Sequence, residues 1–343
     1  MRQLPGLDLD ALAGWLDAEH PGLRAGELTG EVIAGGKSNL TYRVTDETST
    51  WAVRRPPLGH VLPTAHDMAR EFRVISALSA TDVPVAPAVA LCTDPAVLGV
   101  TFYLMGFVDG VVLDTAELVD AVPIASATRL GEELADSLAA LHAVDPARIG
   151  LSDFGRPEGY LARQVVRWHK QWLASQTRPL PIEARVVDLL TTRRPESPAS
   201  AIVHGDYRLT NVIYDRGLRR IEAIVDWEMA TLGDPLTDVG LLCVYHQLAG
   251  ESGAIVPRMT SEAGFLTPGE LTQRYARTSG RDISGLPWYI GFGYFKLAVI
   301  AEGIAARHQQ GKTVGDGFDW FAEAVPGLLD SALDALDALD ALD

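Results

Sequence analysis

The sequence contains little cysteine and no long apolar stretch. Only Cys92 and Cys243 occur among 343 residues, which is too few for a disulfide framework or a cysteine-based metal site and fits a reducing compartment. The longest apolar stretch, Val97–Val108, is 12 residues long and too short to span a bilayer. The N-terminal residues lack the basic-then-apolar order of a secretion signal. We therefore expect a soluble, cytoplasmic protein.

Positive charge is also scarce. The chain holds 29 Lys and Arg against 45 Asp and Glu, a formal charge of −16. Such a charge repels nucleic acid and anionic membrane surfaces, so neither is an expected partner. Half of the excess lies after Lys312, where eight acids and no base occur in 31 residues. The acidity therefore gives no argument for a cationic substrate, and the oligomeric state stays unknown.

The remaining composition is that of an ordinary globular protein, with 47% hydrophobic and 22% charged residues. Periodicity predicts a short helix at 8–20, three strands between residues 27 and 55, a helix over 64–80 that Thr64 caps, and two further strands before residue 108. After residue 110 the pattern is mostly helical. We expect an α+β fold with two lobes, a small antiparallel β lobe at 1–107 and a larger α-helical lobe at 108–343.

The helical lobe is predicted to contain one β-rich segment at 201–227. The expected helices span 124–144, 158–175, 183–191, 234–248, 268–278, 286–308 and 318–343. The last of these ends in an Ala-Leu-Asp repeat, which drifts around a helix of 3.6 residues per turn instead of holding one face. We interpret residues 330–343 as a low-complexity acidic tail and a solvated helical extension, with a charged interaction tail as the alternative.

The segment from His204 to Asn211 carries polar residues that suit phosphoryl transfer from ATP. That reaction needs a carboxylate to accept or orient the proton of the attacking hydroxyl, oxygen ligands for Mg²⁺, and cations against the transferred group. Asp206 suits the first role, Asn211 and Asp226 suit the second, and Arg208 is placed to meet the γ-phosphate. His204 is expected to orient the loop backbone. The alternative is a polar hairpin loop whose side chains satisfy turn amides.

Candidate nucleotide-binding residues lie upstream. Gly36 and Ser38 belong to a Gly-rich loop between two strands, where backbone N–H groups can face phosphates; an ordinary hairpin turn is the alternative. Arg54, on the next strand, provides a cation for the phosphates. Glu71, on the following helix, can hold that cation in position, and Asp67 is a rival partner one turn earlier.

In chain order, six segments carry a family resemblance: GGKSNLTYRV, AVRR, MAREF, FYLMGFVDG, HGDYRLTNVIYD and IVDWEMATLGDPLTDVG. They resemble the aminoglycoside/choline phosphotransferase superfamily, above all bacterial phosphotransferase-family proteins and the kinase domains fused to some acyl-CoA dehydrogenases. The resemblance implies a protein-kinase-like fold that binds ATP and Mg²⁺ with Asp206 as base and Asn211 and Asp226 as metal ligands. It also implies that adenine meets the connector through the Gly106 carbonyl and the Val108 N–H.

The sequence departs from the kinase pattern at two positions. Arg54 stands where the family has lysine, so a planar fork replaces a point charge. Gly205 stands where protein kinases carry an arginine before the catalytic aspartate, which removes the anchor for a phosphorylated activation loop and favours a small-molecule kinase. Downstream, Asp234 before Pro235 is expected to cap a helix, and Asp238 to brace the catalytic loop.

The acceptor is expected to lie against the helical lobe. The predicted helix at 158–175 interleaves basic residues (Arg163, Arg167 and Lys170) with Trp168 and Trp172. Such a stripe suits an anionic or CoA-bearing hydroxylated substrate better than a polycationic aminoglycoside; the alternative is a solvated basic face with its tryptophans in the core.

We therefore expect an ATP-dependent O-phosphotransferase that acts on the hydroxyl of a small molecule, with a hydroxyacyl or hydroxyacyl-CoA compound as the favoured acceptor. Two alternatives stay open. One is an aminoglycoside-type antibiotic kinase. The other is a catalytically silent nucleotide-binding regulatory protein, which Arg54 suggests and the joint presence of Asp206, Asn211 and Asp226 opposes.

Overall fold

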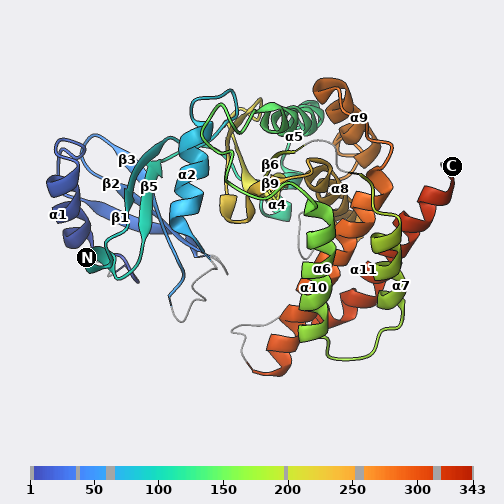
Figure 1. The fold of residues 1–343 in the computed structure, drawn as a ribbon. Helices are drawn as coiled ribbons and strands as arrows, with labels where there is room; N and C mark the ends of the chain where they lie inside the picture. The colour runs from blue at the N-terminus through green and yellow to red at the C-terminus, as the bar shows by residue number, and fades with distance from the viewer. Residues whose placement is uncertain are drawn as a thin grey trace. The chain divides into compact units, whose positions relative to one another are not determined.

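The computed structural model (Figure 1) describes residues 4–35, 39–58, 66–196, 200–251, 259–311 and 318–341. The chain divides into two compact units. The first comprises Met1–Val112, Ile149–Leu151 and Asn211–Ala230, and the second comprises Leu113–Arg148, Ser152–Thr210 and Thr231–Asp343. The roles that the sequence suggests for two lobes, and their boundary between residues 107 and 108, stay predictions.

A five-stranded antiparallel sheet forms most of the first unit, as predicted. Its strands are β1 (Thr29–Gly35), β2 (Leu40–Thr45), β3 (Thr50–Arg55), β4 (Ala88–Cys92) and β5 (Phe102–Gly106), in the spatial order β1-β2-β3-β5-β4. A short helix, α3 (Pro95–Leu98), lies between β4 and β5. Helix α1 (Leu9–Glu19) packs its buried Leu12 and Leu16 with Tyr42, Val53 and Leu104 of the sheet. Burial of these side chains holds the helix on the strands.

Helix α2 (Met68–Leu78) begins four residues later than expected. Asp67 caps it, because the Asp67 side chain accepts a hydrogen bond from the N–H of Arg70 at 3.0 Å. The prediction that Thr64 caps this helix was therefore wrong, and Thr64 itself lies outside the described residues. Asp67 was also wrong as the rival partner of Arg54, since Glu71, one turn further on, takes that place.

A β-hairpin brings residues 211–230 into the first unit. Its strands, β7 (Val212–Tyr214) and β8 (Ile221–Ile224), pair antiparallel. Single β-bridges join Tyr214 to Val111 and Ile224 to Val85. Gly110 passes so close to this hairpin that a Cβ on it would lie 2.3 Å from the Tyr214 carbonyl oxygen. After β8 the chain turns at Asp226 into the 3-10 helix η2 (Trp227–Met229).

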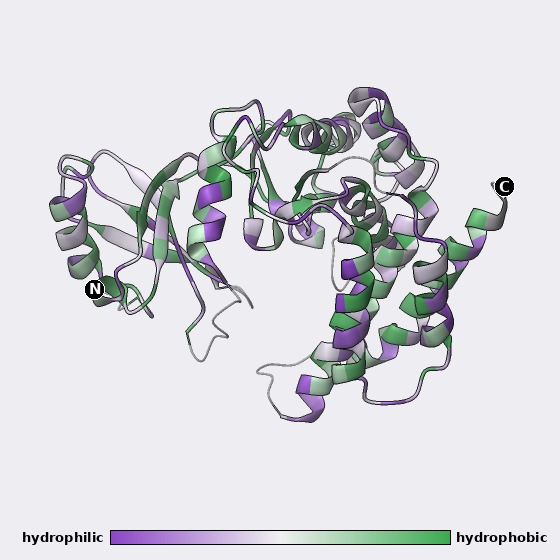
Figure 2. Ribbon diagram, viewed as in Figure 1, coloured by the Kyte–Doolittle hydropathy of each residue, from purple (hydrophilic) through white to green (hydrophobic). Residues whose placement is uncertain are grey.

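The second unit is mostly helical, as predicted. Its helices are α4 (Ala116–Asp120), α5 (Ile124–Ala143), α6 (Tyr160–Ser175), α7 (Ile182–Thr192), α8 (Leu236–Glu251), α9 (Pro268–Ser279), α10 (Leu286–Gln309) and α11 (Asp319–Asp337). Along α6, hydrophobic and hydrophilic residues alternate in bands (Figure 2). Two short strands, β6 (Ala201–Val203) and β9 (Thr231–Gly233), pair antiparallel. The 3-10 helix η1 (Leu209–Asn211) follows the loop after β6.

Helix α10 is the central core helix of the second unit and packs against α6, α8 and α11. Its length and apolar composition would allow it to cross a membrane, but 78% of its most apolar window is buried within the protein. Sequence reasoning considered only uninterrupted apolar runs when it expected no segment long enough to span a bilayer. It did not select α10, because Lys296 and Glu302 interrupt the apolar sequence of this helix. Both of these residues are buried.

Helix α11 belongs to the core, which corrects the prediction of a solvated extension. Leu329, Ala332 and Leu336 are fully buried. Leu336 packs so closely on α10 that a Cβ at Gly291 would lie 2.6 Å from the Leu336 Cγ. Spacings of three and four residues put these three side chains on one face, so the first turn of the repeat, from Ala332 to Leu336, continues the buried face of the helix. A 3-10 turn, η3 (Ala338–Ala341), follows the helix.

Alanine should have opposite effects at two helical glycines, one in the contact between α8 and α10 and one on an open part of α11. A Cβ at Gly240 of α8 would lie 2.6 Å from the carbonyl oxygen of Tyr289 in α10, whereas Gly327 of α11 has no neighbour within 4 Å that a Cβ would meet. Gly240→Ala should lower the free energy of unfolding by about 1–3 kcal/mol, and Gly327→Ala should raise it by about 0.5–1 kcal/mol. Urea unfolding measures both, and equal effects would contradict the close packing of α8 on α10.

Candidate functional site

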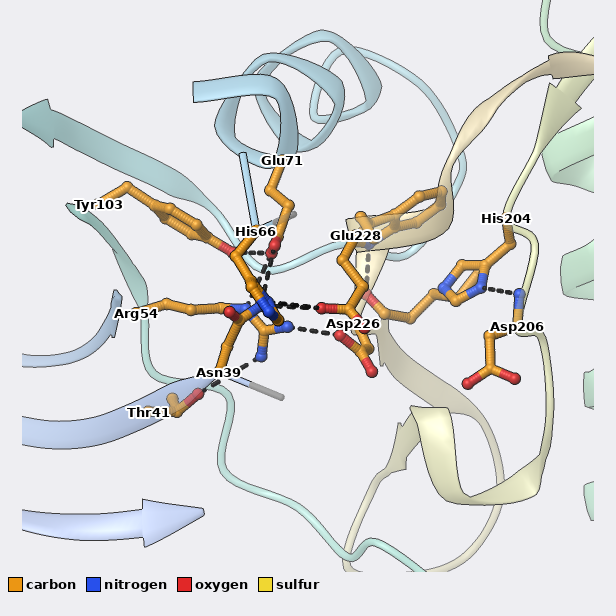
Figure 3. Close-up of polar contacts among 12 residues, drawn as sticks. Asn39, Thr41, Arg54, His66, Glu71, Tyr103, His204, Asp206, Asp226 and Glu228 are labelled. Atoms are coloured by element: carbon orange, nitrogen blue, oxygen red, sulfur yellow. Dashed lines mark hydrogen bonds and ion pairs between the residues drawn. The ribbon is translucent and has the colours of Figure 1, made fainter. Parts of the chain in front are cut away.

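Arg54 is the centre of a buried network of charged side chains in the first unit (Figure 3). Its Nε donates a hydrogen bond to Oε2 of Glu71 at 2.8 Å, and its Nη2 donates to Oδ1 of Asp226. The third nitrogen, Nη1, lies 3.5 Å from Oγ1 of Thr41. Glu71 also accepts a hydrogen bond from the hydroxyl of Tyr103 at 3.1 Å. The predicted pairing of Arg54 with Glu71 is therefore present, and it includes the candidate metal ligand Asp226.

Burial and charge oppose each other in this network. Burial raises the pKa of Glu71; Arg54 opposes that rise and the carboxylates of Asp226 and Glu228 add to it. Burial lowers the pKa of Arg54, but the surrounding anions outweigh this effect and raise its pKa overall. Burial, together with the charge of Glu71, also raises the pKa of Tyr103 well above its usual value. Arg54 thus stays charged, and Tyr103 keeps the proton that it donates to Glu71.

Asn39 links the end of the Gly-rich loop to the same network. Its Nδ2 donates to Oε1 of Glu71 and to Oε2 of Glu228, both at 3.1 Å, and Asn39 is buried. The Nδ1 atom of His66 lies 3.6 Å from that Glu228 oxygen. Asn39, which directly precedes β2, therefore connects Glu71 of α2 with Glu228 of the 3-10 helix η2.

Sequence reasoning missed Asn39 and Glu228. Both lie in segments that it had already selected, within the letters GGKSN and DWE. The available signal was that each is a polar residue close to a selected one, Asn39 beside Ser38 and Glu228 two residues after Asp226. Gly36 and Ser38, which it selected from the same loop, lie outside the described residues.

The two candidate metal ligands, Asn211 and Asp226, lie in the first unit. Asp226 has φ 68°, a left-handed conformation that residues other than glycine adopt infrequently. The backbone carbonyl of Asn211 accepts a hydrogen bond from the N–H of Val225 at 2.9 Å, which brings the two segments side by side. Among the described residues, no three or more His, Cys, Asp or Glu gather as a metal site. One carboxylate and one amide oxygen do fit Mg²⁺ shared with nucleotide phosphates; their role stays a prediction.

The connector residues Gly106 and Val108 lie at and just beyond the end of β5. The N–H of Gly106 donates to the carbonyl of Pro87 at 2.8 Å, and Gly106 pairs with Trp51 of β3. A Cβ at Gly106 would lie 3.2 Å from the Pro87 ring. The backbone at this point is thus held by two neighbouring segments, and its contacts with adenine stay predictions.

Asp206 and Arg208 lie in the second unit, on the loop after β6. The N–H groups of His204 and Gly205 donate to Oδ2 and Oδ1 of Asp238 at 2.7 and 2.8 Å. The N–H of Asp206 donates to Nδ1 of His204 at 3.3 Å. These bonds confirm the expectations that Asp238 braces this loop and that His204 orients its backbone.

A buried histidine supports that brace and was not predicted. In the interior of the second unit, His142 of α5 places Nε2 3.3 Å from Oδ2 of Asp238 and Nδ1 2.8 Å from the hydroxyl of Tyr275. Burial lowers the pKa of His142, with Asp238 opposing. A neutral ring that carries its proton on Nε2 donates to Asp238 and accepts from Tyr275. Nearby, Asp234 accepts from the N–H of Leu236 at 3.0 Å, which confirms its expected role at the start of α8.

The two oxygens of Asp206 have different partners. Nε of Arg208 lies 3.4 Å from Oδ2, and the hydroxyl of Tyr245 donates to Oδ1 at 2.5 Å. The guanidinium of Arg208 also lies over the Tyr245 ring, 5.1 Å from its centre. Sequence reasoning selected Arg208 from the motif but missed Tyr245, because α8 carries it outside every recognised segment.

The basic stripe of α6 is only partly available to a ligand. Arg163 donates to the backbone carbonyls of Arg156 and Glu158, so it fixes the preceding loop. Trp168 and Trp172 are buried in the core, as the alternative reading of this helix expected, whereas Arg167 and Lys170 are exposed. The aromatic group at the start of α10 is likewise packing, since Trp288 and Phe292 are buried and stacked on each other.

The network around Arg54 predicts a large loss of stability when its cation is removed. Arg54→Met should lower the free energy of unfolding by about 3–5 kcal/mol, because the buried Glu71 carboxylate loses its counterion. Adding Glu71→Leu should recover much of that loss, since the most buried charge is then removed and the Asp226 carboxylate that also loses Arg54 is 27% exposed to water.

Urea unfolding of the single and double variants measures this coupling. Arg43→Met is a matched control, because Arg43 pairs with Glu31 at the surface at 3.3 Å, and its loss should cost no more than about 1 kcal/mol. A double variant no more stable than Arg54→Met would contradict this account.

Comparisons with known proteins identify the family and the fold. The crystal structure of an aminoglycoside phosphotransferase candidate from Ralstonia eutropha JMP134 is 33% identical, with a TM-score of 0.84 over 96% of this chain and 98% of that one. Acyl-CoA dehydrogenase family member 11 of Homo sapiens is 30% identical over 334 residues, which cover 95% of this chain but 43% of that protein. The chain thus spans less than half the length of that curated relative.

More distant structures share the fold alone. Spectinomycin phosphotransferase APH(9)-Ia, in complex with ADP and spectinomycin, is 13% identical, with a TM-score of 0.62 over 96% of this chain and 98% of that one. The model of the phosphotransferase enzyme family matches residues 29–271. Because that match spans most of the chain and the Ralstonia structure aligns with it nearly from end to end, this chain belongs to the phosphotransferase enzyme family and has its kinase-like fold.

Proposed function

We propose that this protein transfers the γ-phosphate of ATP to a hydroxyl group of a small molecule in the cytoplasm, with Mg²⁺ as cofactor. The observation that carries the proposal is the fixed carboxylate of Asp206. Its loop is braced by Asp238 through two backbone N–H groups, and its oxygens face Tyr245 and Arg208. A base must be held in this way to act on one hydroxyl. A relative of the same fold binds ADP, which supports the nucleotide.

In the proposed reaction, the acceptor oxygen attacks the γ-phosphorus as the bond from that phosphorus to the β,γ-bridging oxygen breaks and ADP leaves. Asp206 orients the hydroxyl and takes its proton, and Arg208 offers positive charge to the transferred group. Asn211 and Asp226 would hold Mg²⁺, which neutralises charge on the phosphates. Arg54, kept charged beside Glu71, offers a further cation.

The adenine and phosphate contacts come from the nucleotide-binding residues of the first unit. We propose that the Gly106 carbonyl and the Val108 N–H meet adenine and that the backbone at Gly36 and Ser38 covers the phosphates. A catalytically silent protein would not need a braced base, and Arg54 keeps the positive charge of the usual lysine. An active enzyme is therefore the better proposal.

The charges near Asp206 favour an anionic acceptor over an aminoglycoside. Burial is the main cause of the lowered pKa of Lys296. Arg167 and Arg208 are close enough to lower it further. Arg167 and Lys296 also lie over the same ring, that of Trp168. A polycationic acceptor would be repelled by such a group, whereas a hydroxyacyl or hydroxyacyl-CoA compound would be attracted. Relatives named as acyl-CoA dehydrogenases support the acyl-CoA class.

The function is tested by ADP formation from ATP and Mg²⁺ with a panel of acceptors: 3-hydroxybutyryl-CoA, 4-hydroxypentanoate, choline and kanamycin. Asp206→Asn should lower kcat at least about 100-fold, because the general base is lost, while KM for ATP stays near its wild-type value. Asp188→Asn, an exposed isosteric change on α7, is the control. Wild-type turnover by Asp206→Asn would refute the assignment of the base.

The acceptor class is tested by removing Arg167, one of the exposed cations of α6. Arg167→Met should raise KM for 3-hydroxybutyryl-CoA about 10-fold, the loss of one charge-assisted contact, and leave KM for ATP unchanged. Arg185→Met removes an exposed arginine that pairs with Asp337 at 3.1 Å on the surface of α11 and should change neither constant. Phosphorylation of kanamycin alone, with no effect of Arg167→Met, would refute an anionic acceptor.

A further inference from the structure

Two buried side chains outside the sequence motifs converge on the loop of the proposed base. Tyr245 lies on α8 and Lys296 on α10, and both are buried, with exposed fractions of 5% and 8%. We propose that Tyr245 and Lys296 are positioning residues, which fix the carboxylate of Asp206 for phosphoryl transfer. This inference rests on the proposed role of Asp206 as the base.

Tyr245 acts on the carboxylate itself. Its hydroxyl donates to Oδ1 of Asp206 at 2.5 Å, while Nε of Arg208 lies 3.4 Å from Oδ2. A donor on one oxygen and a cation near the other fix the rotation of the carboxylate about its Cβ–Cγ bond. The Tyr245 ring also supports the Arg208 guanidinium, 5.1 Å above its centre. One side chain therefore orients both motif residues of the loop.

Lys296 acts on the backbone that precedes the base. Its Nζ donates to the carbonyl oxygen of Gly205 at 2.6 Å, and the N–H of Gly205 donates to Asp238 at 2.8 Å. Gly205 has φ 85°, where a side chain would be strained. Both polar groups of this flexible residue are thus held, one by α8 and one by α10. The Gly205 carbonyl belongs to the peptide that joins Gly205 to Asp206, so Lys296 sets the direction in which Asp206 leaves the loop.

Packing alone does not account for an amine at this position of α10. Burial lowers the pKa of Lys296, Asp206 and Asp238 oppose that effect, and Arg167 and Arg208 add to it. The ammonium has a carbonyl oxygen and the face of Trp168, 5.5 Å from the ring centre, as partners. An apolar side chain of similar length would avoid the cost of desolvating the charge. A cost of this kind is typical of residues retained for function.

The experiment separates positioning from a purely structural role. Turnover is measured as ADP formation with ATP, Mg²⁺ and the acceptor of the panel above that gives the highest wild-type rate. Tyr245→Phe keeps the ring and removes the hydroxyl, and it should lower kcat about 10-fold or more with KM for ATP changed less than about twofold. Lys296→Met should lower kcat similarly while its thermal unfolding midpoint equals or exceeds that of the wild type, because a buried charge is removed.

Two further variants sharpen the result. Lys296→Gln keeps a donor for the Gly205 carbonyl and should recover part of the kcat that Lys296→Met loses. Tyr294→Phe is the matched control: its hydroxyl, also buried, donates to Gln247 at 2.7 Å, and its loss should leave kcat unchanged.

The outcomes distinguish this inference from the function on which it rests. Wild-type kcat in Tyr245→Phe and Lys296→Met, together with loss of turnover in Asp206→Asn, would overturn the positioning role alone. A fall in kcat that merely followed a fall in the unfolding midpoint would also overturn it. Unchanged turnover in Asp206→Asn would overturn the proposed function, and this inference with it.

Discussion

The first unit depends on one buried cation. The Arg54 guanidinium lies between the carboxylates of Glu71 and Asp226, and burying the Glu71 charge without this cation would cost several kcal/mol. The pairings therefore tie together β3, α2 and the turn after β8, which are far apart in the sequence. A planar fork can contact two carboxylates at once, so arginine at this position holds the candidate metal ligand as well as the helix. Residues 211–230 fold with the sheet, which places Asp226 where this cation can reach it.

In the second unit, hydrogen bonds stabilise a buried carboxylate, that of Asp238. Asp238 is buried and accepts hydrogen bonds from two backbone N–H groups of the loop that carries Asp206, and His142 contacts Asp238 from α5. Burial raises the pKa of Asp238, but these partners outweigh it and lower the pKa overall. Residues 204–208 of the loop have no regular secondary structure, so its shape comes from buried side chains of α8 and α10. In both units the candidate carboxylates, Asp226 and Asp206, are oriented by polar contacts, and apolar packing supplies the rigid elements that carry them.

The sequence was sufficient for features that are set locally. Periodicity located the five strands and the long helices, and Asp234 before Pro235 predicted the start of α8. Arg54 and Glu71 were paired correctly because strand alternation and helix position constrain where each can reach. The helix cap was misplaced, since Thr64 and Asp67 are both good capping residues and only the backbone path decides between them. His142 and Tyr245 left no signal of their own, because each gains its partner through packing between elements distant in the sequence, and the only signal for Asn39 was its place beside residues already selected. The Ala-Leu-Asp repeat was misinterpreted for the same reason. Its three-residue period drifts around the helix, and only the packing of α11 on α10 shows that Ala332 and Leu336 are buried.

The protein has a negative net charge, but cations lie close to Asp206. Exposed acids on α11 such as Asp334 lie at the surface, where salt screens them within about 8–10 Å. Lys296 is buried beside the loop of Asp206, where the low dielectric strengthens its field and water cannot screen it. In the proposed reaction, an acceptor at Asp206 would therefore interact with the buried ammonium and Arg208 more strongly than with the acidic surface. The proposed preference for an anionic acceptor rests on where these cations are held, and a formal charge of −16 gives no argument against it.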